Sequence, residues 1–179
     1  TEINGQGPVI TEEAINELFA KLATLTKEDI LVLAGSIPNT LPEDIYEKIL
    51  ARLESKGIRV VVDATKDLLL NVLKYHPFLI KPNNHELGEM FGTVCKTDED
   101  IVHYAKKLQE KGAVNVLISM AGDGAILITE DGQNIKMGTP KGKVVNSVGA
   151  GDSMVAGFIT GYIRGGNYEE ALKLSLIHI

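Results

Sequence analysis

Cysteine is nearly absent from this sequence, since Cys95 is the only one among its 179 residues. A lone cysteine excludes a disulfide within the chain and a zinc site built on several thiolates. It also fits a reducing compartment, so we expect a cytoplasmic protein.

Two further features are missing, and each excludes a class of partner. No apolar run approaches the roughly 20 residues that a helix needs to cross a bilayer, so we expect no membrane partner. Positive charge is not in excess either: 18 Lys and Arg stand against 24 Asp and Glu, which gives a formal net charge of −6 at pH 7. Broad binding to nucleic acid needs a positive surface, so nucleic acid is not an expected partner.

The sequence does contain a regular alternation of short apolar runs and helical patterns. Strands are expected at 30–34, 59–63, 78–80 and 114–119, with an edge hairpin at 125–137. Helices are expected at about 12–22, 42–57 (opened by Pro42), 66–75, 85–91, 98–111 and 149–164, with a last one from Tyr168. This alternation is typical of a three-layer α/β/α, Rossmann-like fold, in which helices cover both faces of a mainly parallel sheet. Without a linker or repeat in the chain, we predict one α/β domain over residues 1–179.

Polar or turn-forming residues gather at the edge of the sheet where ligands bind in such folds. They follow Ala34, Val62, Ile80 and Ile118, and they precede the helix at Gly149. Each loop alone would suit an ordinary connection, but five of them on one edge predict a ligand site.

The segment 148–153, Val-Gly-Ala-Gly-Asp-Ser, carries the strongest chemical signal. Gly149 and Gly151 flank Ala150, and these small residues let the N–H groups at a helix start turn toward one point, where the helix dipole adds positive potential. We therefore predict an anion hole for a phosphoryl group in transit. Asp152 lies at its mouth, where a carboxylate repels phosphate but can accept a proton from an attacking hydroxyl. The alternative is a helix start whose dipole is complemented by an acid.

Four segments together resemble a known family. Residues 145–158 resemble the carboxyl-terminal signature of the ribokinase family of sugar kinases, also called the phosphofructokinase-B family. Residues 81–87 resemble its N-x-x-E region, 119–125 its nucleotide-contacting loop, and 35–38 its G-S-[LI]-P loop. The four segments occur in the family's order over nearly the whole chain, so a ribokinase-like fold is expected.

This resemblance implies an ATP- and Mg²⁺-dependent kinase that acts on a ketose phosphate. Residues 1–8 and 146–148 are most similar to members that convert fructose 1-phosphate to fructose 1,6-bisphosphate. Tagatose-6-phosphate kinases share most of these residues, so that substrate stays open.

The resemblance also assigns roles to residues. Asp152 is implied as the catalytic base. Three residues are implied as the anion hole: Gly149, Ala150 and Gly151. Asn83 and Glu86 are implied to place Mg²⁺, largely through water, and Lys81 to reach the transferred phosphate. The expected nucleotide contacts are Lys81, Ser119, Ala121, Gly122, Gly124 and Gly151, and the expected sugar-phosphate contacts are Gly35, Ser36 and Asp152.

Other interpretations of the same residues stay open. Asn83 and Glu86 would also suit a helix cap and a first-turn acid, and Lys81 a solvated lysine before a rigid proline. Asp63 and Thr65 end a strand near the site, where they either touch nucleotide or water or cap the following helix.

One residue departs from the family's pattern, because Ala121 stands where the family usually has glycine. A Cβ there narrows the approach of the nucleotide phosphates if the backbone needs a positive φ, unless Gly122 takes up the turn. The four histidines have no metal-ligand spacing and Cys95 has no neighbouring base, so packing or solvated roles are expected for them.

The family's amino-terminal third, with its sugar-binding loop and lid strands, is missing from these residues. We therefore expect a domain truncated at both ends and inactive by itself. A non-catalytic nucleotide-binding fragment is the alternative from another functional class. An unpaired sheet edge would favour self-association, so a homodimer is the expected assembly.

Overall fold

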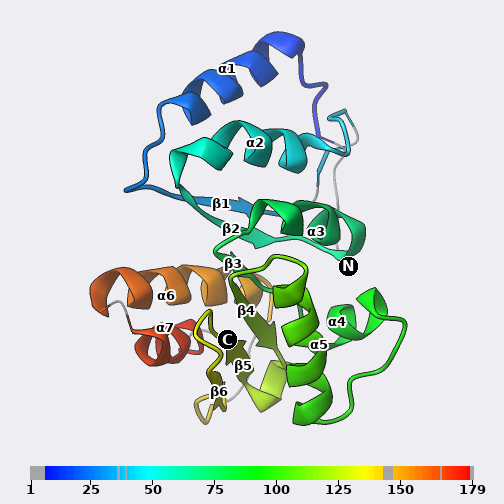
Figure 1. Ribbon diagram of the computed structural model, residues 1–179, viewed down its shortest axis with the longest axis vertical. Coiled ribbons are helices and arrows are strands. Elements are labelled where there is room, and N and C mark those ends of the chain that lie inside the picture. Colours follow the sequence, from blue (N-terminus) through cyan, green and yellow to red (C-terminus); the bar gives the residue numbers. More distant parts are fainter. Residues whose placement is uncertain (1–6, 36, 39, 143–146, 166, 178–179) are drawn as a thin grey trace.

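The apolar runs of the sequence form the strands of one sheet, shown in Figure 1. The computed structural model describes residues 7–35, 37–38, 40–142, 147–165 and 167–177. The strands are β1 (Ile30–Ala34), β2 (Arg59–Asp63), β3 (Leu79–Ile80), β4 (Asn115–Ser119), β5 (Ala125–Ile128) and β6 (Asn134–Met137). Their order in the sheet equals their order in the chain. β1 to β4 are parallel, while β5 and β6 join antiparallel as the expected hairpin.

Helices cover the sheet on both faces, as Figure 1 shows. They are α1 (Glu12–Ala23), α2 (Ile45–Leu53), α3 (Lys66–Val72), α4 (Asn84–Met90), α5 (Asp98–Glu110), α6 (Ala150–Gly165) and α7 (Tyr168–Ser175). Right-handed crossovers that advance in one direction put their helices on one face, so α2 to α5 lie together with α1. α6 and α7 follow the hairpin and pack on the opposite face. The three-layer α/β/α prediction is confirmed.

β2 shows why the inner strands contain continuous apolar runs. Val60 and Val62 pack into the core beneath α1 to α5, while Val61 packs into the core beneath α6 and α7. Val61 and Val62 are both fully buried. A strand buried on both faces needs a continuous apolar run, because neither face meets water.

The second face is covered only in part. Val32 of β1 lies in register with Val61, so it points to the α6 side, yet it is 41% exposed. Its neighbour Leu33, which points to the α1–α2 side, is 7% exposed. β1 is also an edge strand among the described residues, which leaves this part of the sheet open.

Most predicted boundaries agree with the structure, but the expected start of the second helix is wrong. Pro42 does not open it, because residues 42–44 form a separate turn in which the Ile45 N–H donates to the Pro42 carbonyl at 3.0 Å. α2 therefore begins at Ile45. The predicted helix at 66–75 likewise divides into α3 and a 3₁₀ turn at Leu73–Tyr75. Among the described residues, no helix combines the length and apolarity needed to cross a membrane.

Candidate active site

The amino end of α6 has the geometry of an anion site. Gly149 enters the helix with φ of 78°, a left-handed conformation that glycine adopts without steric cost. Ser153 donates its N–H to the Gly149 carbonyl at 2.9 Å, which marks the first full helical turn. In such a turn the backbone N–H groups point out of the helix end, where the dipole is positive. Asp152 is an exposed residue of this same turn.

Lys81 brings a positive charge to this helix end. Its backbone N–H donates to the Val62 carbonyl at 3.3 Å, so the chain after β3 stays beside β2. The residue is only 7% exposed, and its Nζ lies 3.3 Å from Oδ1 of Asp63. A Cβ built on Gly151 would lie 3.2 Å from the same Nζ. The ammonium group of Lys81 is therefore held between the end of β2 and the first turn of α6.

The pKa of Asp63 is shifted by several charges near the first turn of α6. Burial raises the pKa of its carboxyl group, and the negative charges of Asp152 and Glu86 raise it further, although Lys81 acts in the opposite direction. The negative charges of Asp152 and Glu86 thus act on the pair formed by Asp63 and Lys81.

The structure also bears on the interpretations left open for Asp63 and Thr65. Thr65 occupies the N-cap position of α3 but makes no side-chain cap hydrogen bond. Asp63 pairs with Lys81 instead of capping the helix. Thr65 thus stands at the expected cap position without the capping hydrogen bond, and contact of either side chain with nucleotide or water stays a prediction.

Asn83 and Glu86 form a capping box at the start of α4. The Glu86 N–H donates to Asn83 Oδ1 at 2.8 Å, and the Asn83 N–H donates to Glu86 Oε2 at 2.8 Å. The cap interpretation is therefore confirmed for this pair. It is compatible with a metal role, because a carboxylate has a second oxygen that the box does not use.

The donor set fits a magnesium ion held through water. Among the described residues, no three His, Cys, Asp or Glu side chains are grouped closely enough to hold a metal directly. Mg²⁺ prefers oxygen ligands and usually keeps several of its waters, so one or two carboxylates at a phosphate site are enough. Glu86 is the carboxylate that suits this role, since the capping box uses only its Oε2 oxygen.

A cavity of about 940 Å³ lies beside the start of α6. Its lining comes from the starts of α4 and α6, the loop after β4 and the segment after β6. Six predicted site residues line it: Asn83, Ser119, Ala121, Gly122, Ala150 and Gly151. Ligand pockets of roughly 300–1,000 Å³ are the usual size for small molecules, so a nucleotide fits.

The remaining predicted residues lie outside the cavity lining. Lys81 lies next to Gly151 and Asp63. Gly35 follows the end of β1, where Ala34 pairs with Asp63 in the sheet. Ser36 lies outside the described residues. The Tyr46 phenol donates to the Ala34 carbonyl at 3.0 Å, which ties α2 to the end of β1 beside the site.

The loop after β4 is built around a tight turn. Met120 donates its N–H to the Gly124 carbonyl at 2.9 Å, and Thr139 Oγ1 donates to the Gly122 carbonyl at 2.9 Å. Ala121 has φ of 48°, so the turn does require a positive φ at the position where the family usually has glycine. Gly122 does not take up this conformation. The alanine is therefore strained, and it lines the cavity beside the start of α6.

Gly124 serves the turn rather than the cavity. Its φ is 92°, and a Cβ there would lie 2.0 Å from the Met137 carbonyl oxygen at the end of β6. It is not one of the residues that line the cavity. The predicted nucleotide contact at Gly124 is thus indirect, because the residue shapes the loop that carries Ala121 and Gly122.

Sequence reasoning missed part of the cavity wall. Residues 139–142, Thr-Pro-Lys-Gly, line it, and so does His85, for which only a packing or solvated role was expected. A signal was available for the first of these. A turn-forming segment that joins an edge hairpin to α6 must pass along the carboxyl edge of the sheet.

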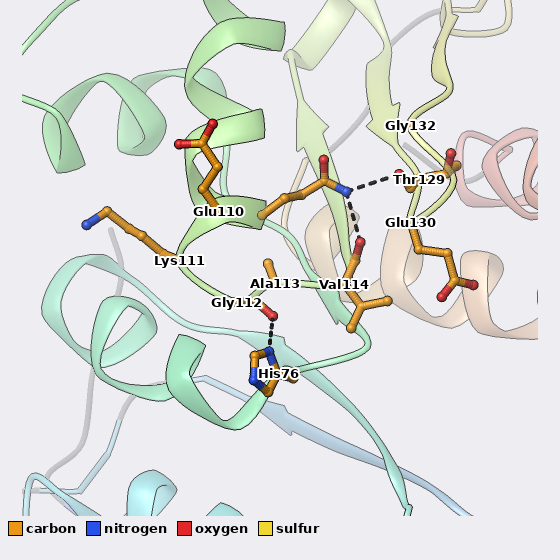
Figure 2. Close-up of a pocket in the computed structure, with 10 residues that line it drawn as sticks. His76, Glu110, Lys111, Gly112, Ala113, Val114, Thr129, Glu130 and Gly132 are labelled. Carbon is orange, nitrogen blue, oxygen red and sulfur yellow. Dashed lines mark hydrogen bonds between the residues drawn. The ribbon is translucent and has the colours of Figure 1, made fainter.

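A second cavity of about 440 Å³ lies at the opposite end of the parallel strands, and Figure 2 shows the residues around it. Two of its polar side chains are paired with backbone carbonyl groups around it. His76 Nδ1 lies 3.1 Å from the Gly112 carbonyl oxygen, and Gln109 donates to the carbonyls of Val114 and Thr129 at 2.9 and 3.0 Å. These partners leave the first cavity as the better nucleotide site.

Comparisons with known proteins agree with this fold. A 1-phosphofructokinase from Bacillus subtilis is 51% identical over 176 residues, which is 98% of this chain and 58% of the relative. A D-tagatose-1-phosphate kinase from Bacillus licheniformis is 35% identical over 173 residues, 96% of this chain and 57% of the relative. A crystal structure described as a phosphofructokinase from Staphylococcus aureus has a TM-score of 0.91 at 44% identity, covering 98% of this chain and 57% of that one.

The ribokinase-like fold, with an acid and a lysine at the amino end of α6, defines a class of small-molecule kinases. The family model of the pfkB carbohydrate kinases matches residues 1–176. The chain belongs to the pfkB family of carbohydrate kinases. It spans less than three fifths of the length of the relatives named above.

Proposed function

We propose that the full-length protein transfers the γ-phosphoryl group of ATP to a ketose phosphate, with fructose 1-phosphate as acceptor and fructose 1,6-bisphosphate as product. The observation that carries this proposal is the ammonium group of Lys81, buried against the first turn of α6 on the helix that bears Asp152. The 51% identity to a 1-phosphofructokinase supports this choice of acceptor.

The side chains suit an in-line transfer. Asp152 accepts the proton of the attacking sugar hydroxyl as the new oxygen–phosphorus bond forms and the bond to ADP breaks. The N–H groups at the start of α6 and the ammonium group of Lys81 neutralise charge on the moving phosphoryl group. When bound, Mg²⁺ supplies further positive charge for the ATP phosphates, and Glu86 would hold its water.

Glu86→Gln is expected to separate the metal role from the helix cap. Glutamine also serves at this position of a capping box, so the free energy of unfolding should change by less than about 0.5 kcal/mol. The lost negative charge should raise the Mg²⁺ concentration needed for half-maximal rate several-fold. Magnesium titration of the initial rate, with thermal unfolding alongside, measures both quantities.

Glu89→Gln is the matched control, because Glu89 is an exposed acid of the same helix that pairs with Lys66. It should leave the magnesium titration unchanged. If Glu86→Gln also leaves it unchanged, Glu86 is only a capping residue.

Substrate choice is tested by a panel of sugar phosphates. The D-tagatose-1-phosphate kinase among the relatives keeps tagatose phosphates as the second candidate acceptors. We expect kcat/KM of the full-length protein to be highest for fructose 1-phosphate, ahead of tagatose 1-phosphate, tagatose 6-phosphate and fructose 6-phosphate. A higher value for a tagatose phosphate would reassign the acceptor, and no transfer to any of them would reject the proposal.

The same assay separates the kinase from a nucleotide-binding module without activity. We propose that residues 1–179 supply the ATP site and catalytic base while the sugar lid lies outside them, so these residues alone should turn over very slowly.

A cytoplasmic location and a homodimer also remain predictions. The open edge strand β1 supports the second of them.

A further inference from the structure

We propose that Asp63 is a positioning residue of the transfer reaction: it holds the ammonium group of Lys81 against the first turn of α6, aimed at the phosphoryl site. The proposal rests on the proposed function, in which Lys81 neutralises charge on the moving phosphoryl group. Asp63 itself is not required to touch either substrate.

Three elements fix this arrangement. Asp63 ends β2, Lys81 follows β3 and donates its N–H to the Val62 carbonyl, and Gly151 lies in the first turn of α6. Nζ of Lys81 is 3.3 Å from Asp63 Oδ1. A Cβ on Gly151 would lie 3.2 Å from Nζ and 3.9 Å from Asp63 Oδ2. The lack of a side chain at Gly151 therefore leaves the space into which Asp63 directs the ammonium group.

The burial of this pair sets it apart from the other lysine–carboxylate pairs of the described residues. The side chain of Lys81 is 8% exposed and that of Asp63 is 21% exposed. Every other lysine paired with a carboxylate there is at least 49% exposed. Burying two charges removes their hydration, so such a pair is weak evidence for added stability. Stability alone therefore does not explain the burial of Lys81. A role in placing its positive charge at the start of α6 does.

Lysine needs such a partner because its ammonium group sits on a flexible four-carbon stem. Without Asp63, the group would sample positions away from the helix end. Misplacing a catalytic group by about 1 Å can lower the rate on the order of 10²-fold. Asp63 should therefore affect kcat through Lys81, and it should have little effect once Lys81 is gone.

A double-mutant cycle tests this dependence in the full-length protein. Asp63→Asn is expected to lower kcat on the order of 10²-fold, with the KM for ATP changed less than about threefold. In a Lys81→Met background, adding Asp63→Asn should lower kcat less than about threefold further, because residues that act as a unit are not additive. Asp63→Glu, which keeps the charge, should restore part of the rate. Asp44→Asn, at an exposed pair with Lys48, is the matched control and should leave kcat unchanged.

A second measurement does not depend on activity. Amine labelling followed by mass spectrometry reports how accessible Lys81 is in the folded chain. Asp63→Asn should speed labelling of Lys81 several-fold, while the exposed Lys136 serves as the internal reference.

The outcomes separate the positioning role of Asp63 from the proposed kinase function. Additive losses in the cycle, or unchanged labelling of Lys81, would overturn the positioning role, and additivity would indicate that Asp63 acts by another route. Faster labelling in a protein that phosphorylates no sugar phosphate would reject the proposed function and leave the placement of Lys81 by Asp63 intact.

Discussion

Replacing Asp152 with asparagine is expected to lower kcat of the full-length protein on the order of 10²-fold or more, because general-base catalysis typically contributes about 10²–10⁴-fold. A sugar hydroxyl is a poor nucleophile until its proton begins to leave, and Asp152 lies in the first turn of α6, at the anion site. Asparagine keeps the size and shape of the side chain but removes its basicity. It also removes a negative charge from a site for phosphate, so the affinity for ATP should hold or tighten slightly.

Steady-state kinetics measure kcat, and calorimetric titration measures the affinity for ATP. Asp67→Asn is a suitable control, because Asp67 is also an acid in the first turn of a helix, α3, and it is not one of the predicted site residues. Near-normal kcat in Asp152→Asn would remove Asp152 from the role of base. Loss of ATP binding would indicate that Asp152 mainly stabilises the start of α6.

Gly124→Ala is expected to lower the free energy of unfolding by about 3 kcal/mol or more, since backbone strain and overpacking each contribute about 1–3 kcal/mol. The backbone at Gly124 is in the left-handed region, and an added Cβ would meet the Met137 carbonyl oxygen at 2.0 Å. Neither the loop nor β6 can accommodate that contact without moving. Urea denaturation of the wild type and the variant measures the difference.

Gly122→Ala is the matched control from the same loop. An added Cβ there meets nothing within 4 Å, and the residue does not have a positive φ. Its free energy of unfolding should change by less than about 0.5 kcal/mol. Because Gly122 lines the cavity, ATP affinity is the property that this substitution should reduce. Equal destabilisation by the two substitutions would contradict the assignment of Gly124 to the turn.

The inner strands of the sheet could be predicted from the sequence because they are buried on both faces. Arg59–Asp63 is apolar at three successive positions and is bounded by turn residues, and the structure has β2 over those same residues. The start of α2 could not be predicted in the same way. Proline suits both the first turn of a helix and a separate turn, and here the hydrogen bond from Ile45 to Pro42 closes a turn.

The candidate site was predictable at the level of segments and not of side-chain pairs. The start of α6 could be recognised from its glycine-rich sequence. The pairing of Asp63 with Lys81 could not be recognised in this way, because α3 and β3 lie between the two residues in the sequence and only the parallel register of β2 and β3 brings their ends together. The pattern at Asn83 and Glu86 suited both a helix cap and a metal site. The sequence alone could not decide between these two roles, because a capping box leaves one carboxylate oxygen free for a metal-bound water.

The most direct test of the account is to map where a nucleotide binds. Amide chemical-shift changes in the ¹⁵N-labelled chain, on addition of a non-hydrolysable ATP analogue with Mg²⁺, report the site residue by residue. The largest changes are expected at Ser119, Gly122 and Gly151, around the cavity beside α6. Changes centred on Gly112 and Gly132, at the cavity of Figure 2, or no saturable change anywhere, would contradict it.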